Sequence, residues 1–533
     1  MENLSLILIL LGIATVLAVA ANRISLPFPI LLVLVGVGIG FIPNLPHIEL
    51  NPDIVFLIFL PPILYSAAWY TSWRDFKQNL RPISLLAVGL VLTTTTAVAT
   101  ALHFVSGIEW SIGFVLGAIV SPPDAVAATA ITQRLNVPKR IITILEGESL
   151  VNDSTGLIAY RFAVTAVVTG FFSFWKATAQ FFLVAIGGIA IGLAVAYAVA
   201  YLHKVLRNNP TIETSLTLLT PFSLYLLAES LHVSGVLAVV AAGLHLTWKA
   251  PLLFSSRTRL QAVAAWDTLI FLLNGFIFIL IGLQLPDIMK TISGQYALPE
   301  LFLYAFAVCF TVIIIRIAWV FPGAYLPRYF SKRIRERETT FNWKFVTVVA
   351  WTGMRGIVTL AAALALPLKT ASGSIFPHRD LIIFLAFSVI LATLVIQGFS
   401  LPYLIKSLKI DAVDESELEE MHARSSAATE ALIRIEEMYD SGLITLDMKQ
   451  RLRIRYDLAL ARLTSSPVII DGAAHESYAE TEERLIEEER NLIIHLRNQG
   501  IIGDEAMRRI EYELDLESSR LERSRQLWDS KSY

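Results

Sequence analysis

The sequence has almost no cysteine and few charged residues for its length. Cys309 is the single cysteine among 533 residues, which excludes an internal disulfide and any metal site built on several cysteines. Charged residues make up 17% of the chain, hydrophobic residues make up 55%, and the mean hydropathy is +0.61. An ordinary soluble enzyme is less apolar, so we expect a membrane protein that crosses the bilayer many times. No basic segment precedes the apolar run at residues 4–20, so we expect a first spanning or half-spanning helix and no cleaved signal peptide.

Apolar runs long enough to cross a bilayer follow one another through the first 410 residues, since a spanning helix needs about 20 such residues. Thirteen runs qualify: 4–21, 26–42, 52–68, 82–102, 110–131, 144–169, 180–202, 214–229, 233–247, 266–285, 299–321, 344–366 and 381–404. We therefore predict an all-α membrane domain at residues 1–410 with about 13 transmembrane helices. Residues 411–533 are dense in Glu, Arg and Lys at helical spacing, which predicts a soluble tail with helices at residues 415–439, 445–463, 477–498 and 504–528.

The loops between these runs differ in charge from one side to the other. Alternate loops from Arg23 to Lys344 collect eighteen lysines and arginines on one side, whereas the other side holds four, namely Lys176, Lys290, Lys369 and Arg379. The positive-inside rule then puts the tail in the cytoplasm and the N-terminus outside the cell. A span wrongly added or missed would have mixed the two sets of loops.

Two of the runs are interrupted near their centres. The fifth contains Ser121-Pro-Pro-Asp124, where two prolines remove backbone donors, and the twelfth contains Thr352-Gly-Met-Arg-Gly356. The two runs hold matching places in two six-span halves, residues 4–169 and 214–404, and run in opposite directions. Paired interruptions of this kind indicate a transporter built from inverted repeats, with its ion site near the middle of the membrane.

The candidate site begins with residues 146–153, which bring carboxylates into an otherwise apolar helix. Ionisable groups at membrane depth cost at least a few kcal/mol each, so they usually face a water cavity and serve ion or proton movement. At about 100° per residue, Ser149 and Asp153 share one helix face, and Glu148 and Asn152 share another. The first face offers hard oxygen ligands for a small cation, and we expect Asp153 to be the carrier.

Four further residues complete this expectation. Asp124 directly follows the double proline at about the depth of Asp153, and the freed carbonyl of Pro123 would add a ligand beside it. Arg316 is the natural partner for Glu148, which makes this pair structural. We also expect a structural role for Arg355, between the dipoles of the half-helices.

The residues at these places resemble the cation/proton antiporter-1 branch of the monovalent cation:proton antiporters, the sodium/proton exchanger family. The matching motifs are Pro61-Pro-Ile63, Ser121-Pro-Pro-Asp124, Gly147-Glu-Ser-Leu-Val-Asn-Asp153, Arg316 and Gly353-Met-Arg-Gly356. The resemblance covers about residues 4–405 and implies thirteen helices, a core domain that slides against a dimerising domain, and a homodimer in membrane lipid. It also implies exchange of Na+ or Li+, and in some members K+, for H+.

Carried over by motif position, the resemblance assigns Asp153 as the shared ligand of cation and proton. Asp124, Ser149 and the Pro123 carbonyl would complete the shell of the transported Na+, and Asn152 would replace the second aspartate of electrogenic relatives. Glu148 with Arg316 would form the structural ion pair. One H+ would then exchange for one cation without net charge movement, in a cell membrane, for pH and sodium homeostasis. No resident cofactor and no nucleic acid is expected.

The sequence departs from the family pattern in two places, and three alternative functions remain open. The family often has Thr-Asp-Pro where this chain has Pro123-Asp124-Ala125, so the threonine hydroxyl is missing and cation preference stays open. Many members carry an acid where Tyr65-Ser66 stands, so no role of that acid carries over to this chain. The first rival is a K+/H+ or non-selective antiporter. The second is an intramembrane protease on the two aspartates, disfavoured because no Gly-x-Gly-Asp setting is present. The third is a channel or nutrient sensor that signals through the tail.

Overall fold

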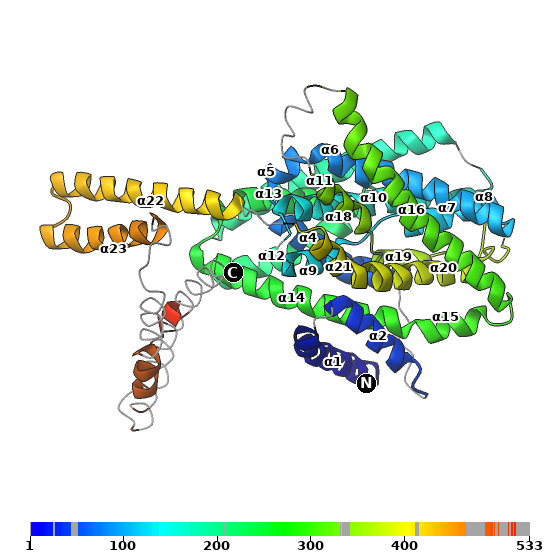
Figure 1. Cartoon of the computed structure of the whole chain (residues 1–533), viewed down its shortest axis with the longest axis horizontal. Helices are drawn as coiled ribbons and strands as arrows, with labels where there is room; N and C mark the ends of the chain where they lie inside the picture. The colour runs from blue at the N-terminus through cyan, green and yellow to red at the C-terminus, as the bar shows by residue number, and fades with distance from the viewer. Residues whose placement is uncertain are drawn as a thin grey trace. The chain divides into compact units, whose positions relative to one another are not determined.

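The computed structural model describes residues 2–24, 27–43, 52–135, 137–171, 173–206, 209–330, 332, 342–371, 373–410, 415–464, 485–493, 495, 499, 510, 513–514 and 516–518. These residues form helices joined by short loops, and the chain separates into two units, Met1–Val413 and Asp414–Tyr533. Figure 1 shows the helices of the first unit packed side by side. The prediction of an all-α fold is confirmed.

Helices of the first unit follow the apolar runs of the sequence. The first half contains α1 (Glu2–Ile24), α2 (Phe28–Gly40), α3 (Pro52–Ile54), η1 (Val55–Phe59), α4 (Leu60–Tyr70), α5 (Trp73–Gln78), α6 (Leu80–Ser84), η2 (Leu85–Leu90), α7 (Val91–Ser106), α8 (Trp110–Val120), α9 (Ala125–Arg134) and α10 (Lys139–Thr169). The rest contains α11 (Phe174–Val205), α12 (Pro210–Ser230), α13 (Gly235–Leu253), α14 (Ser256–Leu283), α15 (Leu285–Ile292), α16 (Leu298–Phe330), α18 (Trp343–Trp351), α19 (Ile357–Leu364), α20 (Arg379–Ala392), η3 (Thr393–Gln397) and α21 (Gly398–Ser407). The segments η1, η2 and η3 are π-helical turns within longer helices.

Several of these helices can cross a bilayer. Among the described residues, seven are long and apolar enough by length and composition, and residues 7–21, 28–40 and 235–250 form shorter apolar helices. Helix α10 is 31 residues long but carries the charged segment that contains Glu148 and Asp153. A multi-pass membrane protein is therefore confirmed, while the count of thirteen and the inverted repeat stay predictions.

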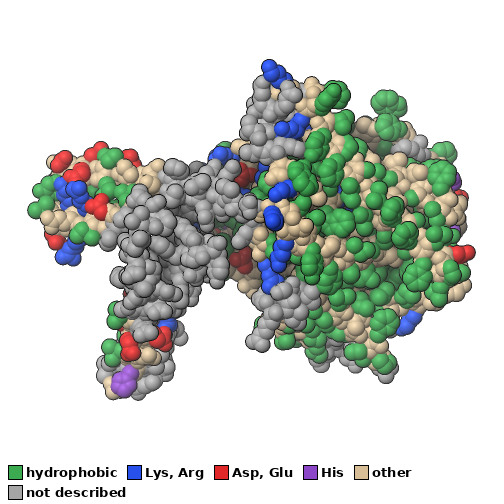
Figure 2. All heavy atoms as spheres, viewed as in Figure 1, with side chains coloured by type: hydrophobic (Ala, Val, Ile, Leu, Met, Phe, Trp, Pro, Cys, Tyr) green, Lys and Arg blue, Asp and Glu red, His purple; other side chains and the backbone are tan. Residues whose placement is uncertain are grey.

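The surface of the first unit agrees with a lipid environment. Large apolar side chains such as Phe104, Tyr201 and Phe306 are exposed. Figure 2 shows hydrophobic side chains over most of the visible face of this unit and a row of Lys and Arg along one of its edges. An apolar surface of this extent is stable against lipid tails and would aggregate in water.

Small residues let the helices around the site approach closely. A Cβ atom at Gly117 of α8 would overlap the backbone of Thr95 in α7, and one at Gly192 of α11 would overlap the backbone of Ala238 in α13. Lipid tails are as apolar as leucine, so helix packing in a membrane depends on such close van der Waals contact. Helix α10 lies against α8, α9, α13 and α18, which places its charged segment inside the bundle.

The second unit contains α22 (Glu415–Asp440) and α23 (Leu446–Thr464). They agree with the two helices that the sequence predicts at residues 415–439 and 445–463. Ion pairs such as Lys449 with Glu436, at 2.5 Å, join them. The two further helices expected at residues 477–498 and 504–528 fall largely outside the described residues.

Candidate cation site

The interrupted helices meet at their breaks. Helix α8 ends at Val120 and α9 begins at Ala125, while α18 ends at Trp351 and α19 begins at Ile357. The backbone N–H of Asp124 donates to the Met354 carbonyl at 2.7 Å, so one non-helical segment is bonded to the other. The prolines explain the first break, because they cannot donate within a helix and disfavour helix in the residue before them. Backbone groups freed at membrane depth need such partners.

Arg355 fills the space between the breaks. Its side chain is buried and donates from Nε to the Val120 carbonyl at 2.9 Å and from Nη2 to the Ser121 carbonyl at 3.4 Å. Nη1 donates to the carbonyl of Gly353 in its own segment. The guanidinium thus satisfies carbonyls at the C-terminal end of α8, where the helix dipole favours a positive charge.

Asp124 caps the second half of its broken helix. Its Oδ1 accepts from the N–H of Val126 at 2.8 Å, as an N-cap residue does. Its other oxygen, Oδ2, lies so close to Gly356 that any Cβ atom at position 356 would overlap it. A glycine is therefore required where the second break approaches this carboxylate.

Helix α10 supplies the other side of the site. The Ser149 hydroxyl accepts from the Ala125 N–H at 3.4 Å, and the Asn152 amide nitrogen donates to the Pro123 carbonyl at 2.8 Å. These two bonds hold α10 against the residues on each side of Asp124. The carboxylates of Asp124 and Asp153 are close enough to interact electrostatically.

The side chains of Asp153 and Asn152 differ in their hydrogen-bond partners. Asp153 is buried, with 6% of its surface exposed, and no hydrogen bond to its carboxylate is found within the part of the chain that the structure describes. The amide oxygen of Asn152 is also buried and has no hydrogen-bond partner among the described residues. Its amide nitrogen donates to the Pro123 carbonyl oxygen. Buried carboxylates usually have partners, so Asp153 is available to bind a cation or a proton.

Glu148, one helical turn before Asn152 on α10, forms an ion pair with Arg316 of α16. Arg316 donates to both carboxylate oxygens of Glu148, at 2.6 and 2.8 Å, and its Nε donates to the Val349 carbonyl at 3.2 Å. Both side chains are almost fully buried. Two parallel charge-assisted bonds and a third acceptor give an arginine the geometry that it prefers, and the pair ties α10 to α16 and α18.

One set of contacts around α10 was not predicted from the sequence. Arg161 pairs with Glu229 of α12 at 2.7 Å, and the hydroxyls of Ser154 and Ser234 lie 2.8 Å apart. Glu229 also accepts from the backbone N–H of Gly235 at 3.3 Å. A lone acid at the end of the apolar run 214–229 was the available signal, but its partner depends on how α10 packs against α12 and α13.

The donor atoms around Asp153 suit a hard cation. They are carboxylate, hydroxyl and carbonyl oxygens, which alkali and alkaline-earth ions prefer, whereas soft metals prefer sulfur and nitrogen. Groups of three or more His, Cys, Asp or Glu side chains that could hold a resident metal are absent from the described residues. A many-helix membrane unit with crossed broken helices and buried oxygen ligands defines the class of secondary ion transporters.

Comparison with known proteins gives the family. The family model described as "Sodium/hydrogen exchanger, transmembrane" matches residues 6–407. An uncharacterized Na+/H+ exchanger of Mycobacterium tuberculosis is 36% identical over 496 residues, which cover 90% of this chain and 89% of that protein. The chain therefore belongs to the sodium/hydrogen exchanger family, whose members are secondary transporters of monovalent cations and protons and not enzymes.

Two other matches extend the comparison. The sodium, potassium, lithium and rubidium/H+ antiporter of Bacillus subtilis is 35% identical over 371 residues, covering 68% of this chain and 55% of that protein. The structure of the sodium proton antiporter MjNhaP1 from Methanocaldococcus jannaschii matches with a TM-score of 0.61 and 21% identity, over 77% of this chain and 99% of that one. The match to MjNhaP1 shows that the two proteins share a fold.

Proposed function

We propose that the protein exchanges Na+ or Li+ for H+ and that Asp153 is the group for which the two ions compete. The observation that supports this most is the buried Asp153 carboxylate, which has no hydrogen-bond partner among the described residues and lies beside Asp124 where the broken helices meet. One carboxylate cannot hold a proton and ligate a metal ion at the same time. Binding of either ion therefore excludes the other, which is the condition for exchange.

The cation shell would contain Asp153, Asp124 and the Ser149 hydroxyl, with the carbonyl of Pro123 nearby. The support is geometric, because the hydrogen bond of Ser149 to Ala125 and that of Asn152 to Pro123 bring these groups together. Asn152 would act as a neutral neighbour that fixes the Pro123 carbonyl, and the Glu148–Arg316 pair would hold α10 against α16 and α18. Alternating access would move the bound ion from one side of the membrane to the other.

We further propose an electroneutral exchange of one H+ for one cation. With a neutral Asn152 next to Asp153, a single proton balances a single cation, so the membrane potential would not drive the cycle. Each uncompensated charge would add about 2.3 kcal/mol per 100 mV.

The setting of the protein is part of the same proposal. Residues 1–410 would form the antiporter domain of a homodimer in the cell membrane, and residues 411–533 a cytoplasmic helical tail. Support for this orientation is the excess of Lys and Arg in alternate loops, which favours a cytoplasmic C-terminus and an external N-terminus.

A K+/H+ or non-selective exchanger is the second candidate. The similarity to a Bacillus subtilis protein named for four alkali cations favours it. The absence of a threonine before Asp124 leaves the shell without one hydroxyl, which bears on ion preference.

Transport in everted membrane vesicles tests the proposal. Addition of Na+, Li+ and K+ in turn, with a fluorescent reporter of the pH gradient, measures exchange with each cation. We expect activity with Na+ and Li+ and none in Asp153→Asn. The matched control is Asp287→Asn in α15, which removes a carboxylate far from the helix breaks in sequence. Exchange retained by Asp153→Asn would refute the assignment, and exchange with K+, alone or as well as with Na+ and Li+, would favour the second candidate.

A further inference from the structure

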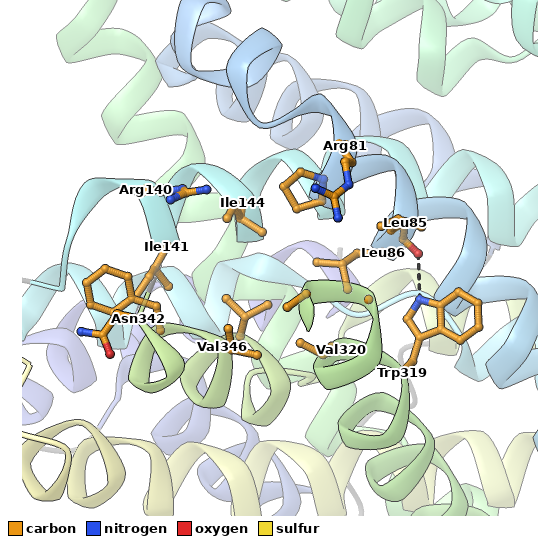
Figure 3. Close-up of a pocket in the computed structure, with 15 residues that line it drawn as sticks. Arg81, Leu85, Leu86, Arg140, Ile141, Ile144, Trp319, Val320, Asn342 and Val346 are labelled. Carbon is orange, nitrogen blue, oxygen red and sulfur yellow. Dashed lines mark hydrogen bonds between the residues drawn. The ribbon is translucent and has the colours of Figure 1, made fainter. Parts of the chain in front are cut away.

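A hollow separate from the cation site lies among the ends of four membrane helices (Figure 3). Its walls come from α6 with η2, from the start of α10, from α16, and from the start of α18. It encloses about 110 Å³, well above the roughly 10–15 Å³ that a single water needs. None of the residues proposed to bind the cation lines it.

The two sides of the hollow differ in chemistry. Arg81 and Arg140 lie on one side of it with Ile144 between them, and the other side contains apolar side chains such as Val320 and Val346 together with the amide of Asn342 (Figure 3). Arg140 donates from Nε to the amide oxygen of Asn79 at 3.2 Å, and this neutral partner does not cancel its charge. The hollow therefore combines a cationic rim with an apolar interior.

The location of the hollow fits the boundary between lipid and water. Trp319 lines it and donates from its ring N–H to the Leu85 carbonyl at 3.0 Å, and tryptophan is enriched at such boundaries. The N-termini of α10 and α18 begin at Lys139 and Trp343, beside lining residues, and helix N-termini attract negative charge. The rim also lies on the side that the basic loops mark.

We propose that this arginine-rimmed hollow binds an anionic phospholipid. The phosphate would accept hydrogen bonds from the Arg81 and Arg140 guanidiniums, which match the geometry of phosphate oxygens, and part of an acyl chain would cover the apolar wall. A free phosphate ion would leave the apolar wall uncovered, and a neutral lipid would bring no negative charge to Arg140, which donates to the neutral amide of Asn79. The inference goes beyond exchange activity and does not depend on it.

A bound lipid would join helices that lie far apart in the sequence. It would contact α6 and α10 through its headgroup and α16 and α18 through its chain, next to the broken helix that contains Arg355. Because a ligand that binds only the folded state stabilises it by mass action, lipid binding should raise the melting temperature.

Thermal unfolding of the purified full-length protein in neutral detergent tests the proposal. Dioleoylphosphatidylglycerol should raise the melting temperature by more than dioleoylphosphatidylcholine at the same mole fraction. Soluble glycerol 3-phosphate should raise it little. An equal rise with phosphatidylcholine would overturn the headgroup role, and an equal rise with glycerol 3-phosphate would overturn the lipid in favour of a soluble anion.

Two kinds of variant locate the effect. In Arg81→Gln/Arg140→Gln most of the extra rise with phosphatidylglycerol should disappear, whereas Lys204→Gln/Lys249→Gln, which removes two basic side chains outside the lining, should keep it. Gly323 lines the hollow, and a Cβ atom there meets open space. Gly323→Phe would therefore fill the hollow without a backbone clash and should remove the response while both arginines remain.

The control for the second variant is Gly38→Phe in α2, where a Cβ atom also meets open space. Native mass spectrometry of each variant counts retained phosphatidylglycerol and does not require a thermal transition. Retention by both the arginine variant and Gly323→Phe at the wild-type level would overturn the proposal. Loss in both, with retention in both controls, would support it.

Discussion

Replacing Glu148 with glutamine would leave the Arg316 guanidinium buried without its counter-charge. In the native protein both carboxylate oxygens accept from Arg316, at 2.6 and 2.8 Å, and both side chains are excluded from solvent. Removing one partner of a buried ion pair costs about 3–5 kcal/mol because the other charge stays unpaired. We expect this loss for Glu148→Gln and a similar loss for Arg316→Gln.

The double variant Glu148→Gln/Arg316→Gln removes both charges together. Its loss should be smaller than the sum of the two single losses, since neither charge is left alone. The assay is reversible unfolding of the purified protein in mixed micelles at increasing denaturing detergent, followed by tryptophan fluorescence. The free energies of the four proteins form a double-mutant cycle.

The Arg161–Glu229 pair is the matched control for this cycle. It has a similar length, 2.7 Å, but its side chains are 53% and 29% exposed. Exposed ion pairs contribute little to stability, so its coupling should stay below about 1 kcal/mol. Additive losses for Glu148 and Arg316, or equal coupling in the two pairs, would refute the reasoning that burial makes the first pair structural.

Three other features can be tested separately: the approach of Gly356 to Asp124, the Arg161–Glu229 pair, and the charge balance of the exchange. Gly356→Ala would push a methyl group onto the Asp124 carboxylate, so the Na+ concentration for half-maximal exchange should rise strongly. The control Gly12→Ala, where a Cβ atom meets open space, should have no such effect. An unchanged half-maximal Na+ concentration in Gly356→Ala would contradict the close approach. Arg161→Gln would remove the ion pair between α10 and α12. In a Cys309→Ala/Ser154→Cys background, the introduced cysteine should then react faster with a maleimide than in the same background with Arg161 retained. Equal rates would show that this pair does not limit access to α10. In proteoliposomes, a potential of about 100 mV clamped with valinomycin should not drive a Na+-dependent pH change, because a one-for-one exchange moves no net charge; a driven change would disprove electroneutrality.

Much of the frame could be predicted from the sequence because membrane burial restricts where polar groups can lie. The double proline at 122–123 and the glycines around Arg355 predicted both helix breaks, and the structure confirms the interruptions. The pairing of Glu148 with Arg316 was predicted because a buried acid needs a buried base. The structure places these two side chains in contact.

The contacts that depend on packing between distant helices could not be predicted. Nothing local in the sequence indicates that Asn152 donates to Pro123, that Ser149 accepts from Ala125, or that Gly356 lies against Asp124. Each depends on how α10 crosses the two breaks. The hollow near Arg140 was also missed, since its wall combines four segments that are separate in the sequence.

The central claim is that a cation and a proton compete for the Asp153 carboxylate. The most direct measurement adds NaCl to the purified protein in weakly buffered detergent and records both heat and released protons. We predict that each bound Na+ releases about one proton when Asp153 is protonated beforehand, and that Asp153→Asn neither binds Na+ nor releases a proton. Na+ binding without proton release in the wild type, or unchanged release in Asp153→Asn, would contradict the account.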